Sequence, residues 1–528
     1  MINPFKFLLL IILLQFTTCS FSQNIWLNTE TNLLNEQTVN PDSNFHYTVK
    51  PYTVNDFNHF NKIKDVKFTS RLEVKLLNDN MMKIEGGSVK VKVNPIIHTQ
   101  YFYDNKSKDL FYNNRIGINI FAKFKDKFYI TSDIFYSKSK LSESQSLFAD
   151  SFKIIPHYGR YLSSNNIYDF MSFTGELTYK PNNNIFFHLG RGKHFFGNGY
   201  HSLFLSDNSN SYTYFKTTVD IWKIKYVWLV ANLNDFELYK FEQDFTMYNK
   251  AAFMHYFSYN VSKRININFF ETIITNPYDH KGNRVGYEAA YYNPVVFFRP
   301  VEFYSGTSDN SLLGLGLNIR LFKSLHLYSQ FILDDLIISR LNDGSGWWGN
   351  KFGIQAGLKS YNFLNVKGLF LRGEINVVRP YTYSHGINVS DDGVANLNYG
   401  SYHQNLAHPL GANFAEGIAE INYNKGRFMT SATIILAKKG VDKDTVSYGG
   451  DIYKDYNLRP NDLGITFLQG EIYNYTFANI KASYLINPNY NLRFELGAYY
   501  RNVANLSNTT FYFGLSTNIF NDRNDFMQ

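Results

Sequence analysis

The sequence predicts an all-β protein, a transmembrane antiparallel β-barrel of about 18 strands with long extracellular loops and short periplasmic turns. Three observations lead to this prediction. Aromatic residues make up 18% of the 528 residues and are spread along the whole chain. Segments of strand length alternate between apolar and polar residues. Short polar turns alternate with long connections, which is how outer-membrane barrels are built.

The alternation is clearest in three segments, "MSFTGELTYK" (171–180), "IWKIKYVWLV" (221–230) and "LLGLGLNIRL" (312–321). In each, apolar side chains share one face while polar side chains or glycines share the other. About ten residues is the length that crosses a bilayer at a tilt. A secreted β-sandwich is the alternative, but its strands are shorter and its outward face is polar.

The connections between these strands fall into two classes. We expect tight turns at 123–127, 180–184, 260–264, 322–324, 424–426 and 487–491, a longer turn at 361–367, and another near Val219 and Asp220. We expect long segments at 138–170, 192–211, 233–251, 275–311, 334–350, 379–416 and 438–466. Eight hairpins, an opening strand at 88–100 and a closing strand at 510–520 give about eighteen strands.

The N-terminus has the pattern of an export signal, so the division of the chain begins there. Lys6 precedes the apolar core "FLLLIILL", and a small-residue cleavage site follows Ser22. Cleavage would remove Cys19, the only cysteine, so no disulfide or thiol chemistry is expected; a lipoprotein anchored at Cys19 is the alternative. We predict a signal peptide (1–22), a periplasmic cap, plug or irregular strands (23–87), the barrel (88–520) and a C-terminal tail (521–528).

Several functional classes are excluded by composition and motif. The net charge of +8 is interspersed, so nucleic acid is not an expected partner. The segment "GRGKHFFGNG" lacks the Gly-Lys-Ser/Thr ending of a phosphate-binding loop, and no G-x-S-x-G elbow is present. His385, His403 and His408 lack the paired spacing of a zinc site. We therefore expect no enzyme activity, no metal and no cofactor.

The predicted strand order places the unusual segments on one rim. The strand that ends in Arg191 rises from the short turn at 180–184, so the glycine-rich stretch after it emerges on the extracellular side. Aromatic faces stack on sugar rings and basic groups hold acidic substituents, which suggests a polysaccharide-binding surface. Packing of loops into the barrel mouth is the alternative. The candidate binding residues are Arg191, Lys193, His194, Tyr200, Arg299, Trp347, Trp348, Arg379, Tyr381, Tyr383, His385 and His408.

Two pairs of charges lie on the polar faces of predicted strands. Arg372 and Glu374 form one pair and Arg493 and Glu495 the other, each at i,i+2 spacing. We interpret them as an internal network of the lumen, with a selectivity ring as the alternative.

Several motifs resemble a known family. "LGRGKHFFGNGYHSLFLSDNS" resembles the G-R-x-K-x-x-x-G-x-G-x-x-S-L-x-L-S-D-N signature of Wzi-type capsule-assembly outer-membrane barrels. "YYNPVVFFRPVEF", "WWGNKFGIQAG", "RPYTYSHG" and "LAHPLGANFAE" resemble the Bacteroidota branch of RemB-like gliding-motility proteins. The resemblance implies a monomeric eighteen-stranded barrel, closed on the periplasmic side by an N-terminal helical element, that acts as a lectin. Residues 23–87 show no clear helical pattern.

The expected function is that of a non-enzymatic barrel in the cell outer membrane. Its extracellular loops would bind surface polysaccharide or a surface partner, in capsule or envelope assembly or in gliding. The expected partners are outer-membrane lipid, surface polysaccharide, and proteins of a gliding or secretion machinery. The alternatives are a diffusion porin or solute channel, a barrel hydrolase, and a structural subunit of a secretion or motility complex.

Overall fold

The structure is a computed structural model of the chain. It describes residues 27–37, 39, 43–52, 70–236, 247–277, 284, 286–295, 297–305, 309–390, 393–517, 521, 524 and 525. The predicted signal peptide, residues 1–22, lies outside the described residues.

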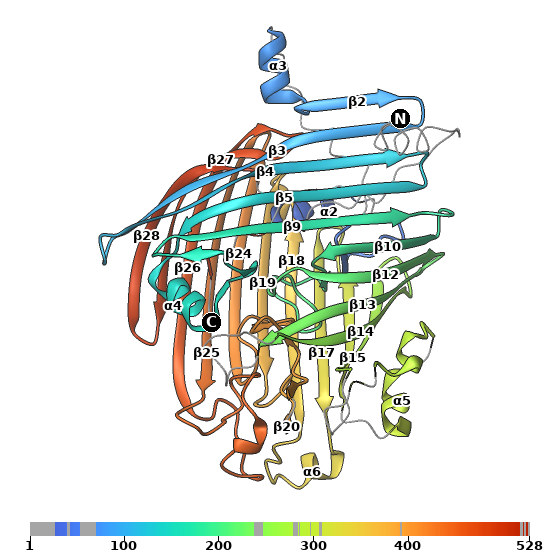
Figure 1. Ribbon diagram of the computed structural model, residues 1–528, viewed down its shortest axis with the longest axis vertical. Helices are drawn as coiled ribbons and strands as arrows, with labels where there is room; N and C mark the ends of the chain where they lie inside the picture. The colour runs from blue at the N-terminus through green and yellow to red at the C-terminus, as the bar shows by residue number, and fades with distance from the viewer. Residues whose placement is uncertain are drawn as a thin grey trace, which may run out of the picture.

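Eighteen antiparallel strands close into one barrel, because the last strand pairs with the first (Figure 1). In chain order they are β3 (Val89–Asp104), β4 (Leu110–Phe124), β5 (Phe128–Lys140), β9 (Tyr168–Tyr179), β10 (Ile185–Gly192), β12 (Tyr212–Ile221), β13 (Ile224–Phe236), β14 (Met247–Asn260), β15 (Ile265–Thr275), β16 (Asn310–Arg320), β17 (Leu325–Asp335), β18 (Lys351–Tyr361), β19 (Leu369–Val378), β24 (Phe414–Lys425), β25 (Phe428–Val441), β26 (Glu471–Asn487), β27 (Leu492–Val503) and β28 (Leu506–Ser516). The predicted fold class is confirmed.

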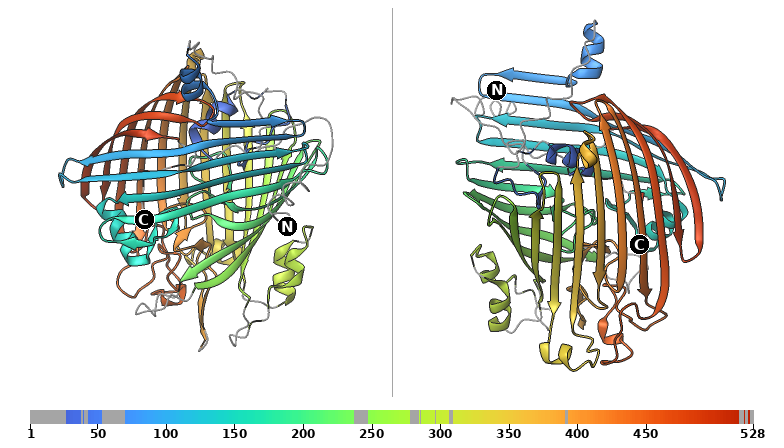
Figure 2. Two further views of the ribbon diagram at one scale, coloured as in Figure 1. Left: turned by 45° about the horizontal axis from the view of Figure 1, so that its top comes forward. Right: turned by 180° about the vertical axis from the view of Figure 1, so that it is seen from behind.

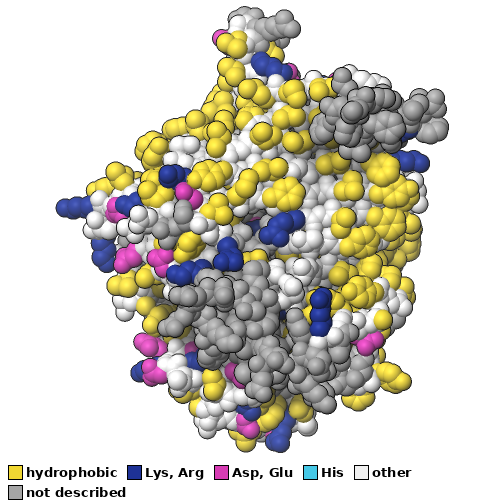
Figure 3. All heavy atoms as spheres, in the orientation of Figure 1, with side chains coloured by type: hydrophobic (Ala, Val, Ile, Leu, Met, Phe, Trp, Pro, Cys, Tyr) yellow, Lys and Arg dark blue, Asp and Glu magenta, His cyan; other side chains and the backbone are white. Residues whose placement is uncertain are grey.

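The period-two alternation explains why these segments form a barrel wall. On β19, Arg372, Glu374 and Asn376 are buried and face the lumen. Ile375, which lies between Glu374 and Asn376, faces outward and is 61% exposed. Hydrophobic side chains cover most of the upper half of the face seen in Figure 3. Such an outward apolar surface is what hydrocarbon requires of a barrel wall.

The connections follow the predicted two-sided pattern, with three differences. On the extracellular side the first and last hairpins are short, spanning 105–109 and 504–505. The turn expected near Val219 and Asp220 lies slightly later, at 222–223, because β12 continues to Ile221 and Trp222 adopts a positive φ of 58°. The closing strand ends at Ser516, and residues 518–520 of the predicted strand lie outside the described residues.

Smaller elements decorate the two rims and the lumen. The helical ones are α2 (Thr29–Glu36), α3 (Arg71–Asn78), α4 (Glu143–Phe152), η3 (Ala289–Tyr292), α5 (Phe298–Ser305), α6 (Ile338–Asn342), η4 (Phe363–Asn365) and η5 (Tyr456–Leu458). The short strands are β1 (Val49–Lys50), β2 (Met82–Gly86), β6 (Ile154–Ile155), β7 (Gly159–Arg160), β8 (Ser163–Ser164), β11 (Phe195–Phe196), β20 (Ile387–Ser390), β21 (Gly393–Asn396), β22 (Gly400–Ser401) and β23 (Gln404–Asn405). Among the described helices, none has the length and apolar character needed to cross a membrane.

Helix α2 lies inside the ring of strands near the periplasmic rim (Figures 1 and 2). Asn28 caps it by accepting a hydrogen bond from the Thr31 amide at 2.9 Å. Leu33 packs on Tyr361 and Phe370 of the inner wall. The helix has only eight residues, mostly polar, so it shows no apolar periodicity that sequence inspection could detect.

Ion pairs attach α2 to the wall on two sides, and the one at Glu36 is buried. The Glu36 carboxylate lies 2.9 Å from Lys359 Nζ of β18 and 3.7 Å from Lys50. Glu30 lies 2.6 Å from the Arg493 guanidinium of β27 and also pairs with Lys481 of β26. Burial opposes ionisation of Glu36, but Lys359 and Lys50 outweigh it and hold the pKa of this carboxyl below its ordinary value of 4.5.

The segment after α2 runs along the inner wall toward the middle of the lumen. The Asn44 side chain donates to the Trp222 carbonyl at the periplasmic turn, and His46 Nδ1 lies 2.8 Å from Ser258 Oγ. Further along, β1 pairs with β11, the strand that follows β10 and turns back into the barrel. Segments of the protein thus enter the lumen from both rims.

Replacing Glu36 tests the attachment of α2. Glu36→Gln leaves Lys359 and Lys50 buried without their counter-charge. We therefore expect the free energy that holds residues 27–52 against the wall to fall by about 3 kcal/mol. The folded pKa is depressed, so the stabilisation is complete above about pH 4.5 and declines at lower pH, where variant and parent should converge. Protease sensitivity of residues 27–52 in purified protein measures this. Glu85→Gln, on exposed β2, should behave like the parent.

Candidate functional site

The glycine-rich segment 193–211 fills the barrel mouth from the extracellular side and is held by the inner wall. The Glu374 carboxylate accepts from the backbone amides of Tyr200 at 2.7 Å and His201 at 3.3 Å. The Tyr328 hydroxyl donates to the same carboxylate at 2.7 Å. One wall residue of β19 therefore fixes the tip of the segment inside the lumen.

A second wall residue, Gln330 of β17, holds the same segment at Phe196 and Leu203. The Gln330 side chain accepts from the Leu203 amide at 2.8 Å and donates to the Phe196 carbonyl at 2.9 Å. Phe196, Leu203, Phe204 and Leu205 are fully buried in the large apolar cluster that fills the barrel. The segment is a folded part of the interior rather than a loop in solvent.

The glycines of this segment are required by close approach. A Cβ on Gly199 would lie 2.5 Å from Glu374 Oε2 and 2.4 Å from the His201 carbonyl oxygen. A Cβ on Gly197, where φ is +151°, would lie 2.6 Å from Gln330 Nε2. This supports the packing interpretation of the glycines.

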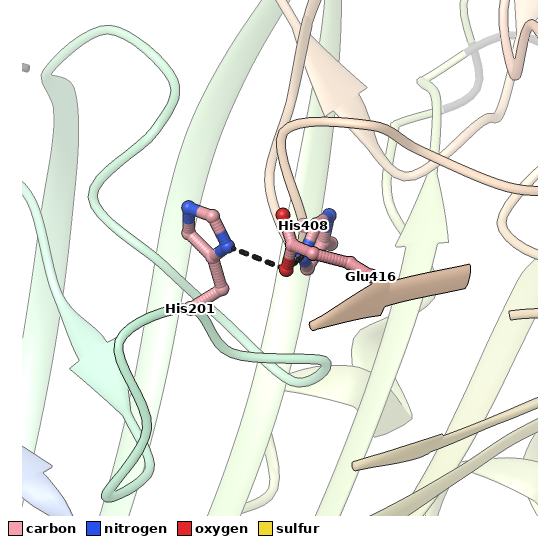
Figure 4. Close-up of side chains that lie close together, drawn as sticks. All are labelled: His201, His408 and Glu416. Atoms are coloured by element: carbon pink, nitrogen blue, oxygen red, sulfur yellow. Dashed lines mark hydrogen bonds and ion pairs between the residues drawn. The ribbon is translucent and has the colours of Figure 1, made fainter. Parts of the chain in front are cut away.

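Residues 397–413 enter the lumen beside it, and the two segments meet at a buried carboxylate. His201 Nδ1 lies 3.1 Å and His408 Nε2 2.8 Å from Glu416 Oε2 of β24 (Figure 4). Asn376 donates to the same oxygen at 2.8 Å. All three cluster residues, His201, His408 and Glu416, are at most 2% exposed at their side chains.

This cluster has the residue types of a metal site, but its hydrogen bonds oppose that use. The Leu410 amide donates to His408 Nδ1 at 3.2 Å, so the ring proton is on Nε2, which donates to Glu416. A metal at Nε2 would move that proton to Nδ1, against the Leu410 N–H. Burial lowers the pKa of His408, which keeps the ring neutral. The arrangement fits a carboxylate that joins two loops.

A second group of side chains lies at the extracellular tip and is called here the rim aromatic cluster: Trp347, Trp348, Tyr381, His385 and Tyr456, with Arg340, Lys351 and Arg459. The Arg459 guanidinium lies 3.9 Å from the Trp348 ring centre, and the Tyr456 ring lies 4.8 Å away. Trp347 and Trp348 are partly exposed. Burial lowers the pKa of His385 to about 4, so the cations of the cluster are Arg and Lys.

Three loops distant in sequence build this cluster. The Trp348 amide donates to the Asp462 carbonyl at 3.0 Å, and the Tyr381 amide donates to the Gly449 carbonyl at 3.0 Å. A Cβ on Gly449 would lie 2.4 Å from the Tyr381 nitrogen, so this junction also requires glycine. The cluster is therefore a fixed platform rather than a set of independent loop tips.

The structure brings together only part of the predicted binding set. Trp347, Trp348, Tyr381 and His385 meet in the rim aromatic cluster, whose Arg340, Lys351, Tyr456 and Arg459 were missed. The signal for the last two was present, since "DYNLRPND" lies in a predicted long loop. Their partners could not be identified from sequence because the residues that join the loops lie far apart in the chain, as Trp348 and Asp462 do.

Four other predicted residues serve interior packing. His194 is buried, its Nδ1 3.2 Å from the Tyr212 hydroxyl, and burial lowers its pKa. The Tyr383 hydroxyl donates to the Leu203 carbonyl at 2.8 Å. The Tyr200 hydroxyl donates to Asp525, beyond the last strand, at 3.0 Å. His408 belongs to the buried carboxylate junction described above.

The remaining four predicted residues make their contacts outside the rim aromatic cluster as defined above. Arg191 lies two residues after the exposed Leu189 on β10 and therefore faces outward like it, whereas His188 faces inward. Lys193 Nζ donates to the Asp207 carbonyl at 3.1 Å. Arg299 lies on α5, outside the barrel wall. The Arg379 guanidinium lies over the Phe352 ring.

The predicted lumen charges are all inward and buried, but their contacts are not with their i,i+2 neighbours. Arg372 lies 3.3 Å from Glu420 on β24. Glu374 holds the glycine-rich segment, and Arg493 holds Glu30 of α2. Glu495 accepts from Gln100 at 2.7 Å. Glu374 and Arg493 therefore position internal segments, whereas Arg372 and Glu495 join residues of the wall.

Comparison with solved structures identifies the architecture. Wzi of Escherichia coli, described as an outer-membrane protein involved in group 1 capsule assembly and as a carbohydrate-binding β-barrel, superposes with a TM-score of 0.52 over 93% of this chain and 99% of its own, at 10% identity. The fold is that of an outer-membrane β-barrel. OprD of Pseudomonas aeruginosa (TM-score 0.42, 9% identity, 85% of this chain and 98% of its own) and opdK of the same organism (0.45, 7%, 81% and 97%) are more distant. No protein-family model and no curated relative matches the sequence.

Substituting Gly199 tests the packing of the glycine-rich segment. Gly199→Ala forces the segment away from Glu374. We therefore expect the free energy of unfolding to fall by about 2 kcal/mol and the unfolding temperature in detergent to be lower. Gly192→Ala is the matched control, because its Cβ would meet only Tyr214 at 3.6 Å. Equal unfolding temperatures for the two variants would contradict the close approach described here.

Proposed function

We propose that the chain is a non-enzymatic outer-membrane barrel whose extracellular loops bind surface polysaccharide with acidic substituents. The rim aromatic cluster carries this proposal. Indole and phenol faces stack on the apolar faces of sugar rings, and guanidinium groups hold carboxylates in a bidentate geometry. The cluster presents both kinds of group on a platform fixed by three loops.

The charges of the cluster fit an anionic ligand. The Arg340 side chain is 49% exposed, and its carboxylate neighbour Asp343 lies at 3.5 Å on the same short helix. Arg459 is 16% exposed, lies against Trp348 and pairs with Asp462 at 2.6 Å, whose side chain is 57% exposed. A sugar stacked on the exposed part of an indole would therefore have a cation beside its ring substituents. The acidic class of polysaccharide is proposed for this reason.

The described interior favours a closed barrel over a diffusion channel. Residues 193–211 and 397–413 pack with the wall in one apolar cluster, against which Val49 also packs. Helix α2 is held in the lumen by the Glu36–Lys359 ion pair. Two cavities in the described interior have volumes of about 120 and 80 Å³; the larger is lined by Asn28, Glu30 and Tyr200, and the smaller lies between the wall and the loop that follows β5. Spaces of that size hold a few water molecules.

The similarity to Wzi supports the proposal at the level of fold. Its description as a carbohydrate-binding barrel shows that this architecture can serve that purpose, while 10% identity carries no detail of the ligand. A role in capsule or envelope assembly or in gliding, with partners from a gliding or secretion machinery, is proposed on the sequence motifs alone. Monomeric assembly and export through residues 1–22 have the same basis.

Removing the two indoles tests polysaccharide binding. For the double variant Trp347→Ala, Trp348→Ala we expect at least about tenfold weaker binding of purified protein to acidic surface polysaccharide, because two stacking faces are lost. Trp222→Ala is the control, since Trp222 is 66% exposed on the periplasmic turn. Unchanged binding by the double variant would show that the rim aromatic cluster is not the polysaccharide-binding surface.

Conductance in planar bilayers tests the closed lumen. We expect the parent protein to be nearly silent and a variant lacking residues 27–52 to conduct, because the periplasmic plug is then absent. Steady ion currents through the parent, with voltage-independent open probability, would favour the porin alternative.

A further inference from the structure

Glu271 on β15 is an unusual residue for its position in the wall. Phe270 and Ile274 face the lumen and belong to the interior cluster, so Glu271 faces outward. Its cross-strand neighbour on β14 is His255, and His255 Nδ1 lies 3.4 Å from the Glu271 carboxylate. A polar pair therefore lies on the outside of the barrel, where a membrane offers no hydrogen-bond partner.

The pair interrupts a row of apolar side chains. Along the same hydrogen-bonded row, the outward neighbours are Trp228 next to His255, and Leu313 followed by Leu333 next to Glu271. On the periplasmic side of Glu271, Ile267 is 45% exposed. The pair therefore lies within the apolar outer wall and not above it.

The loop between β15 and β16 covers this pair. Residues 286–295 and 297–305, here called the cover segment, contain η3 and α5 and lie outside the barrel wall in both Figures 1 and 2. The backbone amides of Phe298 and Arg299, at the start of α5, donate to Glu271 Oε1 at 2.7 and 3.2 Å. The Phe298 ring stacks on the His255 ring with 4.1 Å between centres. The wall residue thus caps a helix that lies on top of it.

Apolar packing completes the contact between the cover segment and the wall. Tyr291 and Phe298 are fully buried against Phe253 and Ile273, which are outward wall residues. The Tyr226 hydroxyl of β13 donates to the Pro294 carbonyl. The cover segment therefore occupies the place that lipid occupies along the neighbouring strands.

Large apolar side chains of the cover segment are exposed. Val295, Phe303 and Tyr304 are 84%, 89% and 92% exposed, and Phe297, which contacts the wall, is 60% exposed. The Arg299 side chain, paired with Glu302, is 54% exposed on the same segment. Phe297 touches Phe269, whose neighbour on β16, Leu315, is 58% exposed on the bare wall. The apolar surface of the cover segment is thus continuous with the apolar surface of the barrel.

We propose that the cover segment is embedded in the outer leaflet, where it shields the His255–Glu271 pair from hydrocarbon and contacts acyl chains through Phe303 and Tyr304. Large aromatic side chains of this kind are stable at the membrane interface. The extracellular half of the β13–β15 wall is then two layers thick, a protein layer between the barrel and the lipid.

Site-directed labelling in vesicles tests this placement. Phe303→Cys and Tyr304→Cys, each with Cys19→Ser, are labelled with an environment-sensitive fluorophore in purified protein reconstituted in phospholipid vesicles. We expect quenching by acyl-chain spin-labelled lipid as strong as for Ile480→Cys on the bare wall, and at least about fivefold less quenching by aqueous iodide than for Leu341→Cys on α6. Iodide quenching equal to that of Leu341→Cys would overturn the proposal.

Two further measurements separate lipid from other occupants. Protection that disappears when the protein-to-lipid ratio is lowered would indicate a second copy of the chain and would also overturn the proposal. Glu271→Ala removes the oxygen that accepts from both α5 amides, so we expect iodide access at position 304 to rise at least about fivefold while the barrel stays folded. Unchanged access would show that Glu271 does not anchor the cover segment.

Discussion

Hydrogen bonding between β28 and β3 is the constraint on which the rest of the structure depends. A sheet in hydrocarbon must have no free edge, because lipid cannot satisfy backbone N–H and C=O groups. Closure with eighteen strands fixes a ring whose interior is too wide for side chains alone to fill. The chain therefore supplies whole segments to the lumen, from the N-terminal part and from two extracellular loops, and the packing of these segments determines what the barrel can do.

Carboxylates organise those segments. Glu36 fixes α2 against Lys359, Glu374 fixes the glycine-rich segment, and Glu416 joins that segment to the loop carrying His408. Glu271 has the same role on the outer side of the wall, where it holds α5. An ionised carboxylate in an apolar region is stable only when several donors surround it, so each one allows few positions for the segment that supplies them.

The sequence was sufficient for the wall and insufficient for the interior. Alternation in "LLGLGLNIRL" identifies β16, because successive side chains of a strand point to opposite faces and the pattern can be read within the strand alone. Glu374 was identified as inward for the same reason, but its partners Tyr200 and His201 lie 174 and 173 residues away, and only the closed ring brings them together. Arg299 was assigned to the binding surface because its loop is long, whereas the loop folds back along the outer wall. Helix α2 is too short and too polar to show a period.

The pairing of β1 with β11 has a mechanical consequence. Lys50 is on the segment anchored at the periplasmic turn through Asn44, and Phe195 is on the segment that reaches down from the extracellular mouth. Force applied to the outer loops would pass through main-chain hydrogen bonds inside the barrel to residues at the inner rim. The lumen contents form a tether that connects the two sides of the membrane.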